Sequence, residues 1–151
     1  MFYYETEIEW KKAREGQMKG AGLPALSVGA PPEFQGRDGV WSPEHLFVAA
    51  LNSCYMLTFL AIAEFSKVPV ASFSSTAKGT LEKVKNGSYQ ITEIVLKPRV
   101  VIACADDLAR MGRIMEKAKE NCFVSNSIKS AVTVEPEVAL ARTAAAALAA
   151  G

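Results

Sequence analysis

Two of the three cysteines, Cys54 and Cys122, stand where their thiols could react with each other. Cys54 lies in the middle of the uncharged segment Leu46–Ala63, and Cys122 ends an apolar run with spacings of three and four. Both patterns predict helices with the cysteine on the inward face, so the thiols could meet across a helix–helix contact. Such a pair suits disulfide chemistry, but a buried free cysteine more often packs as a small hydrophobic residue. Spacing alone leaves both interpretations open.

Other chemistries have weaker support. The single histidine, His45, falls at the start of the helix around Cys54 and is expected to be a cap-region side chain. One histidine and no close cysteine pair do not make a zinc site. There is no glycine-rich phosphate loop, and a Ser/His/Asp triad would have to use His45. No pattern in the sequence pairs Cys104 with another residue, and its side chain is predicted to pack in the interior.

The composition excludes several classes of partner. The 151 residues include 17 Lys+Arg and 16 Asp+Glu, which is a net charge of +1. This balance gives no electrostatic footprint for nucleic acid or an anionic membrane surface. The N-terminus lacks a signal-peptide layout, and an odd number of cysteines argues against a disulfide framework. We therefore expect a cytoplasmic protein.

The central helix is predicted over Ser42–Phe65. Ser42 is a good N-cap, Pro43 suits the first turn, and Glu44 complements the helix dipole. The uncharged core of this segment is at the lower length limit of a membrane span. Polar interruptions by Asn52 and Thr58 favour burial within the protein instead, so no membrane association is expected.

The remaining pattern predicts an α+β fold with a mainly antiparallel sheet. Pro98 is expected at an edge or a bulge because it lacks an N–H. A single domain is predicted over residues 1–140, followed by an alanine-rich tail at 141–151. The expected strands are a half-buried strand at 4–10, an extended stretch ending near 28, two strands at 73–84 and 89–102 joined by a hairpin at Asn86-Gly87, and one last strand at 131–138. A second helix is expected to begin at Asp106 and Asp107. Its apolar stripe is Leu108, Met111, Met115, Ala118 and Cys122.

The segments WSPEHLFVAALNSC, residues 41–54, and KAKENCFVSNSIKSAVTV, residues 117–134, resemble the OsmC/Ohr family, the osmotically inducible and organic hydroperoxide resistance proteins. The shared pattern is Pro-Glu at the start of the central helix, a cysteine ten residues after that glutamate, and a second cysteine after a basic amphipathic helix. The resemblance covers roughly residues 3–138. It implies an OsmC-like fold, an intertwined homodimer, and a thiol-dependent peroxidase acting on organic hydroperoxides.

The resemblance also implies roles for particular residues. Cys54 would be the peroxidatic cysteine, Cys122 the resolving cysteine and Glu44 the active-site glutamate. Arg14, in Arg-Glu-Gly, is similar to the arginine that the family places in a turn, and Arg37 is a rival for that role. A permanent cation would offset the cost of burying a thiolate, and a carboxylate would hold the guanidinium in place. No cofactor or metal is expected, and an external dithiol such as a dihydrolipoyl group or a lipoylated protein would restore the thiols.

Helix geometry adds a constraint of its own. Glu44 and Cys54 are ten residues apart, which corresponds to about 15 Å along a straight helix. If both serve one site, Glu44 either comes from another subunit or acts only through Arg14. An obligate dimer is expected for this reason. Phe123 departs from the family pattern, which usually has proline directly after the second cysteine.

Two functions follow as hypotheses. The first is the peroxidase, with apolar side chains near Cys54 (Phe47, Leu51, Tyr55 and Met56) as candidates for a substrate pocket. The second is an OsmC-like protein that binds a small ligand or senses redox state without fast turnover.

Overall fold

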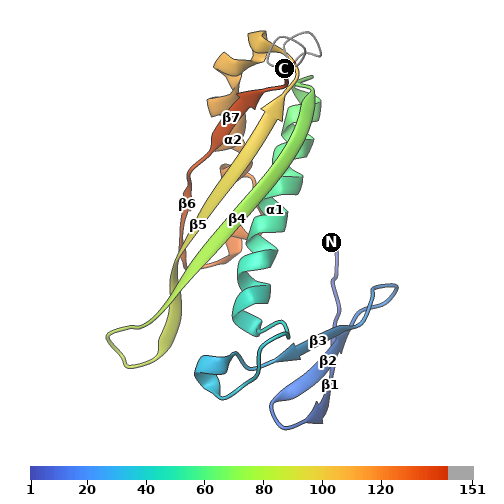
Figure 1. Ribbon diagram of the computed structural model, residues 1–151, viewed down its shortest axis with the longest axis vertical. Coiled ribbons are helices and arrows are strands. Elements are labelled where there is room, and N and C mark those ends of the chain that lie inside the picture. Colours follow the sequence, from blue (N-terminus) through green and yellow to red (C-terminus); the bar gives the residue numbers. More distant parts are fainter. Residues whose placement is uncertain (143–151) are drawn as a thin grey trace, which may run out of the picture. The chain divides into compact units, whose positions relative to one another are not determined.

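The computed structural model describes residues 1–142, and the end of the alanine-rich tail predicted at 141–151 lies outside them. The chain divides into two compact units, Met1–Phe47 and Val48–Gly151, each of which is described by itself. The predicted α+β class is confirmed (Figure 1). The strands are β1 Glu7–Lys12, β2 Glu15–Lys19, β3 Leu26–Gly29, β4 Val70–Lys83, β5 Tyr89–Ile102, β6 Ala131–Val134 and β7 Glu137–Leu140; the helices are α1 Pro43–Phe65 and α2 Leu108–Glu120; and 3-10 turns occupy Pro32–Phe34, Ala105–Asp107 and Ser125–Ser127.

The N-terminal unit is built on an antiparallel sheet in the order β1-β2-β3. The single extended stretch predicted before Val28 is in fact two strands, because the chain turns between β2 and β3 at Gly22, where φ is +72°. The first strand was expected to be half-buried, yet Ile8 is 72% exposed and Trp10 is 74% exposed. Nothing within this unit covers the apolar side of β1.

Helix α1, Pro43–Phe65, begins at its predicted start signals and fills the predicted range. The backbone N–H of His45 donates to Ser42 Oγ at 3.2 Å, which confirms Ser42 as the N-cap. Only one stripe of the helix is buried, namely Leu51, Tyr55, Phe59 and Ala63. Leu57, which is 62% exposed, and Phe65, which is 88% exposed, lie outside that stripe. By length and composition α1 could also cross a membrane.

Strands β4 and β5 form a long antiparallel hairpin through Asn86-Gly87, as predicted. Gly87 has a φ of +83°, which the turn requires, and Asn86 Oδ1 accepts the backbone N–H of Ser88 at 3.0 Å. Alternate residues of β5, from Ile94 to Ile102, are buried. This face of the sheet packs against α1 in a shared core (Figure 1).

Pro98 was predicted at an edge or a bulge, and this prediction is wrong. It lies in β5, the central strand of the sheet. It pairs with β4 on one side and runs parallel to β6 and β7 on the other. Pro98 falls in the interval between Leu96, where pairing with β6 ends, and Arg99, where pairing with β7 begins. The single last strand predicted at 131–138 is divided into β6 and β7 at the same interruption.

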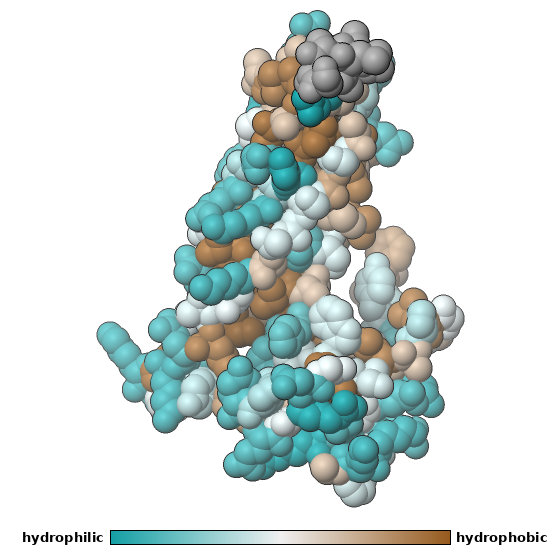
Figure 2. All heavy atoms as spheres, viewed as in Figure 1, coloured by the Kyte–Doolittle hydropathy of each residue, from teal (hydrophilic) through white to brown (hydrophobic). Residues whose placement is uncertain are grey.

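Helix α2 shows the predicted apolar stripe, with Met111, Ile114, Met115 and Ala118 buried. Leu108, predicted on that stripe, is 42% exposed. The hydroxyl of buried Tyr55 donates to the Met115 carbonyl at 3.4 Å and ties α1 to α2. Cys122 lies two residues beyond the helix end and is 0% exposed. Hydrophobic residues also reach the surface at several places on the face drawn in Figure 2.

Gly79 of β4 allows α1 to approach the sheet closely. A Cβ at this position would lie 2.6 Å from Val48 Cγ2, and a valine in a helix has little rotamer freedom to move away. We expect Gly79→Ala to lower the free energy of unfolding by about 1–3 kcal/mol. Urea unfolding at matched protein concentration measures the change.

The matched control is the double variant with Val48→Ala, which removes the clashing methyl group. The double variant should be more stable than the sum of the two single effects predicts. Additive effects would contradict the close approach.

Candidate functional site

Cys54 lies on the side of α1 that faces α2 and the segment following it. It is partly buried and borders a groove of about 980 Å³. The groove is lined mostly by small and apolar side chains, among them Ala50, Leu57, Ala61, Ile62, Phe65, Phe123 and Val124, with Lys117, Glu120 and Asn121 from the end of α2. Leu51 and Tyr55, which were candidates for the pocket wall, belong to the buried core instead.

The structure brings the two predicted cysteines together. Cys54 packs against the core cluster that contains Cys122, and each thiol shifts the pKa of the other. This meeting joins a residue of α1 to one that follows α2, sixty-eight positions later in the chain. Both are free thiols and both belong to the C-terminal unit.

Three further groups near the Cys54 sulfur lower its pKa. Two are the backbone N–H groups of Val124 and Phe123, and the third is the hydroxyl of Thr58, one helical turn further along α1. Burial raises the pKa of Cys54, but these donors and the Cys122 thiol together outweigh it, so the pKa of Cys54 lies below its usual value.

The pKa of Cys122 moves the other way. Burial is the largest cause, and the neighbouring Cys54 adds to it, which raises the pKa of Cys122 to about 11. Cys54 therefore loses its proton first, and Cys122 stays a neutral thiol that can donate to it. The two positions are chemically unequal: one suits a nucleophile and the other a protonated partner.

The two candidate arginines belong to the N-terminal unit, which the structure does not place relative to Cys54. Arg14 Nη1 donates to the backbone carbonyl of Phe34. Arg37 Nε donates to Glu15 Oε1 at 2.7 Å, and this hydrogen bond holds the pKa of Glu15 below its usual value. Among residues 1–142 neither arginine forms an ion pair with Glu44.

Glu44 is partly buried near the start of α1. Its Oε2 atom is buried and has no hydrogen-bond partner within the described part of the chain. A carboxylate oxygen withdrawn from water in this way costs free energy unless something pairs with it.

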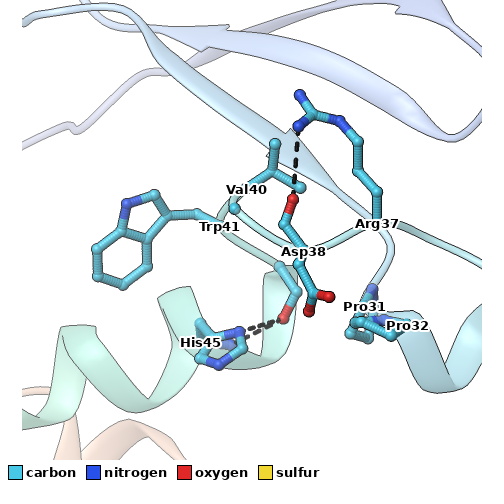
Figure 3. A pocket seen from close by; sticks show the side chains of 9 residues that line it. Pro31, Pro32, Arg37, Asp38, Val40, Trp41 and His45 are labelled. Atoms are coloured by element: carbon cyan, nitrogen blue, oxygen red, sulfur yellow. Dashed lines mark hydrogen bonds between the residues drawn. The ribbon is translucent and has the colours of Figure 1, made fainter.

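His45 has the cap-region role that its position predicts. Its Nδ1 lies 2.8 Å from Ser42 Oγ, and its ring meets Trp41 edge-on (Figure 3). These side chains border a pocket of about 400 Å³ in the N-terminal unit, together with Pro31, Pro32, Arg37, Asp38, Gly39 and Val40. Arg37 Nη1 lies 3.4 Å from the Asp38 carbonyl at the edge of this pocket (Figure 3).

Comparison with known proteins identifies the family. A family model described as OsmC-like protein matches residues 36–137. The chain belongs to the OsmC-like family. It is 33% identical over 134 residues to a peroxiredoxin OsmC of Escherichia coli, with 88% of this chain and 90% of that protein covered.

Solved OsmC-like structures share the fold. An OsmC-like protein of unknown function from Vibrio cholerae superposes with a TM-score of 0.84 at 29% identity, over 90% of this chain and 99% of that one. An organic hydroperoxide resistance protein from Elizabethkingia anophelis has a TM-score of 0.73 at 21% identity, over 93% and 98% of the two chains. At 21% identity, the similarity to the Elizabethkingia protein shows a shared fold and carries no statement about function.

Some features of this OsmC-like site were not predicted. The position of Thr58 beside Cys54 could have been predicted, because the two residues are four positions apart on one helix. The amides of Phe123 and Val124 could not have been predicted in this way, since every residue except proline carries an N–H. Cys104 was predicted to be buried and is exposed, because the joint between β5 and α2 lies at the surface. No group of three or more His, Cys, Asp or Glu side chains suited to a metal ion occurs among residues 1–142.

Proposed function

We propose that this chain is a thiol-dependent peroxidase that reduces organic hydroperoxides to alcohols, with Cys54 as the peroxidatic and Cys122 as the resolving cysteine. The observation that carries the proposal is the contact between two thiols whose pKa values are shifted in opposite directions. The relationship to a protein named peroxiredoxin OsmC supports the same chemistry.

The reaction has two protein steps. The Cys54 thiolate attacks the distal oxygen of the hydroperoxide and breaks the O–O bond, which leaves a sulfenic acid on Cys54 and an alkoxide that takes a proton to become the alcohol. The Cys122 thiol then condenses with the sulfenic acid, forming a disulfide and releasing water. An external dithiol, such as a dihydrolipoyl group or a lipoylated protein, reduces the disulfide and is itself oxidised.

The groove beside Cys54 favours substrates with an organic group. Its exposed apolar side chains, including Leu57 and Phe65, can contact an alkyl chain that hydrogen peroxide lacks. We propose alkyl or lipid hydroperoxides as the class, with the peroxide end at Cys54.

The chain acts as a homodimer in this proposal. The exposed apolar side of β1 and the exposed side of α1, with Trp10 and Phe65, are surfaces that a second copy would cover. Glu44 and Cys54 are too far apart on α1 to share one site, at about 15 Å. Glu44 would therefore serve the partner's Cys54, with Arg14 as its cation and Arg37 as the rival. The unpaired Glu44 Oε2 supports a partner that supplies the missing hydrogen bond.

The test is thiol titration under anaerobic conditions before and after one equivalent of cumene hydroperoxide. Two thiols per chain should disappear while one equivalent of cumyl alcohol forms, and a dithiol should restore both thiols. The Cys104→Ser variant is the matched control and should lose the same two thiols.

Unchanged thiols would instead favour the second hypothesis, a cytoplasmic OsmC-like protein that binds a small ligand or senses redox state. The pocket of about 400 Å³ beside His45 is the observation on which that alternative depends.

A further inference from the structure

Arg14 lies in a turn whose backbone adopts an unfavourable conformation. The connection between β1 and β2 consists of two residues, Ala13 and Arg14. Ala13 has a φ of +42°, a left-handed conformation that glycine adopts freely and a residue with a Cβ atom does not. The indole Nε1–H of Trp10 donates to the Ala13 carbonyl at 2.9 Å, although the Trp10 side chain is 74% exposed. The one donor of this indole therefore holds the turn residue whose conformation is least favourable.

The segment after β3 holds the other side of the same turn. The backbone N–H of Ala30 donates to the Arg14 carbonyl at 3.1 Å, and Arg14 Nη1 donates to the Phe34 carbonyl. The position of Phe34 is itself fixed, because its N–H closes a 3-10 turn by donating to the Pro31 carbonyl at 2.9 Å. The backbone and the side chain of Arg14 are thus anchored to one loop of the N-terminal unit.

Arg14 and Arg37 differ in whether a carboxylate neutralises them. Arg37 Nε donates to Glu15 Oε1 at 2.7 Å, and the Glu15 side chain is only 19% exposed. Arg14 forms an ion pair with no carboxylate of residues 1–142, and Phe34 is the one acceptor there for its guanidinium. Glu15 therefore engages Arg37, while the charge of Arg14 remains available to a carboxylate such as Glu44, whose Oε2 also lacks a partner.

We propose that Trp10 is a positioning residue for the peroxidase: its indole N–H keeps the β1–β2 turn in the conformation that presents Arg14 as the cation of the site. This inference rests on the proposed function and deepens it, because it assigns the cation to Arg14 and withdraws Arg37. Trp10 acts through Arg14 and touches no substrate. If Ala13 relaxed to a right-handed conformation, the guanidinium would leave the Phe34 carbonyl, and the cation would be present but misplaced.

The test compares Trp10→Phe with Arg14→Gln in single turnover. Trp10→Phe removes the N–H and keeps an aromatic ring for the surface that a second copy would cover, and sedimentation velocity checks the dimer. The measurement is the second-order rate constant for oxidation of Cys54 by cumene hydroperoxide. Arg14→Gln should lower this rate constant about 10²-fold, because a permanent cation is lost. Trp10→Phe should lower it about tenfold, because the cation is misplaced.

The double variant separates positioning from a general loss of stability. In the presence of Arg14→Gln, the Trp10→Phe change should lower the rate constant less than about twofold further, since no cation is left to position. In the Trp10→Phe protein, Ala13→Asn should recover most of the lost rate, because asparagine tolerates the left-handed conformation. A wild-type rate in Trp10→Phe, independent effects in the double variant, or no recovery with Ala13→Asn overturns the proposal.

A charge-balanced pair of substitutions tests the assignment of the cation to Arg14. Glu15→Gln combined with Arg37→Gln removes both members of the ion pair and leaves the net charge unchanged. This double variant should lower the rate constant at least about tenfold less than Arg14→Gln does, because the pair is exposed on its Arg37 side and Arg14 is retained. A loss equal to that of Arg14→Gln would return the role to Arg37 and overturn the proposal.

A measurement without peroxide distinguishes failure of this inference from failure of the proposed function. By NMR relaxation, the order parameter of the Arg14 backbone amide should be about 0.85 in wild type and below about 0.6 in Trp10→Phe. An amide that stays rigid in Trp10→Phe overturns the inference and leaves the peroxidase standing. Unchanged thiols in the wild-type titration with cumene hydroperoxide would instead reject the peroxidase, and with it the role of Trp10, even where the order parameter falls.

Discussion

Cys54→Ser is expected to lower hydroperoxide turnover by at least about 10³-fold, because the attacking atom is removed. A serine hydroxyl has nearly the size of a thiol but stays protonated at neutral pH, so the groove and its donors remain while the nucleophile is lost. Steady-state reduction of cumene hydroperoxide with a dithiol as the electron donor measures the effect.

The control is Cys104→Ser, which changes an exposed cysteine away from the groove and should retain wild-type turnover. If Cys54→Ser kept a tenth or more of the wild-type rate, Cys54 would not be the peroxidatic residue.

The second large effect is expected from Cys122→Ser. Its hydroxyl can replace the thiol as a donor to Cys54, so the first attack on peroxide should proceed. The sulfenic acid that forms has no partner for condensation and should persist. We expect one equivalent of alcohol per chain, a sulfenic acid trapped by dimedone on Cys54, and multiple turnover reduced by about tenfold or more.

Single-turnover kinetics followed by peptide mass spectrometry separates the two phases. Wild-type protein treated in the same way should yield the Cys54–Cys122 disulfide and little dimedone adduct. Equal steady-state turnover in wild type and Cys122→Ser would remove Cys122 from the mechanism.

Local signals predicted much of the fold. Ser42 and Pro43 begin helix α1 as their types suggest, and Asn86-Gly87 closes the β4–β5 hairpin. Each of these features depends on residues within a few positions of one another. Pro98 was misplaced because its tolerance depends on β6 and β7, which are distant in sequence and interrupt their pairing at that point.

Burial was the harder property to predict. The uncharged sequence of α1 indicated a helix covered on all sides, but the β4–β5 sheet and α2 together bury one stripe of it. The meeting of Cys54 with Cys122 was anticipated as one of two interpretations. The pKa difference between them was not, because it arises from amides and a hydroxyl whose positions only the folded chain determines.

The full burial of Cys122 has a consequence for regeneration of the oxidised protein. In the proposed reaction, with Cys122 buried, an incoming thiolate would reach the Cys54 sulfur, form a mixed disulfide there and expel Cys122. The expelled thiol remains within reach and can return to displace the newcomer, which makes a monothiol inefficient. A reductant with a second thiol escapes this futile return by closing its own ring and releasing Cys54, whose low pKa makes it a good leaving group. Reduction rates with a monothiol and a dithiol of matched acidity should therefore differ widely, and similar rates would contradict this route.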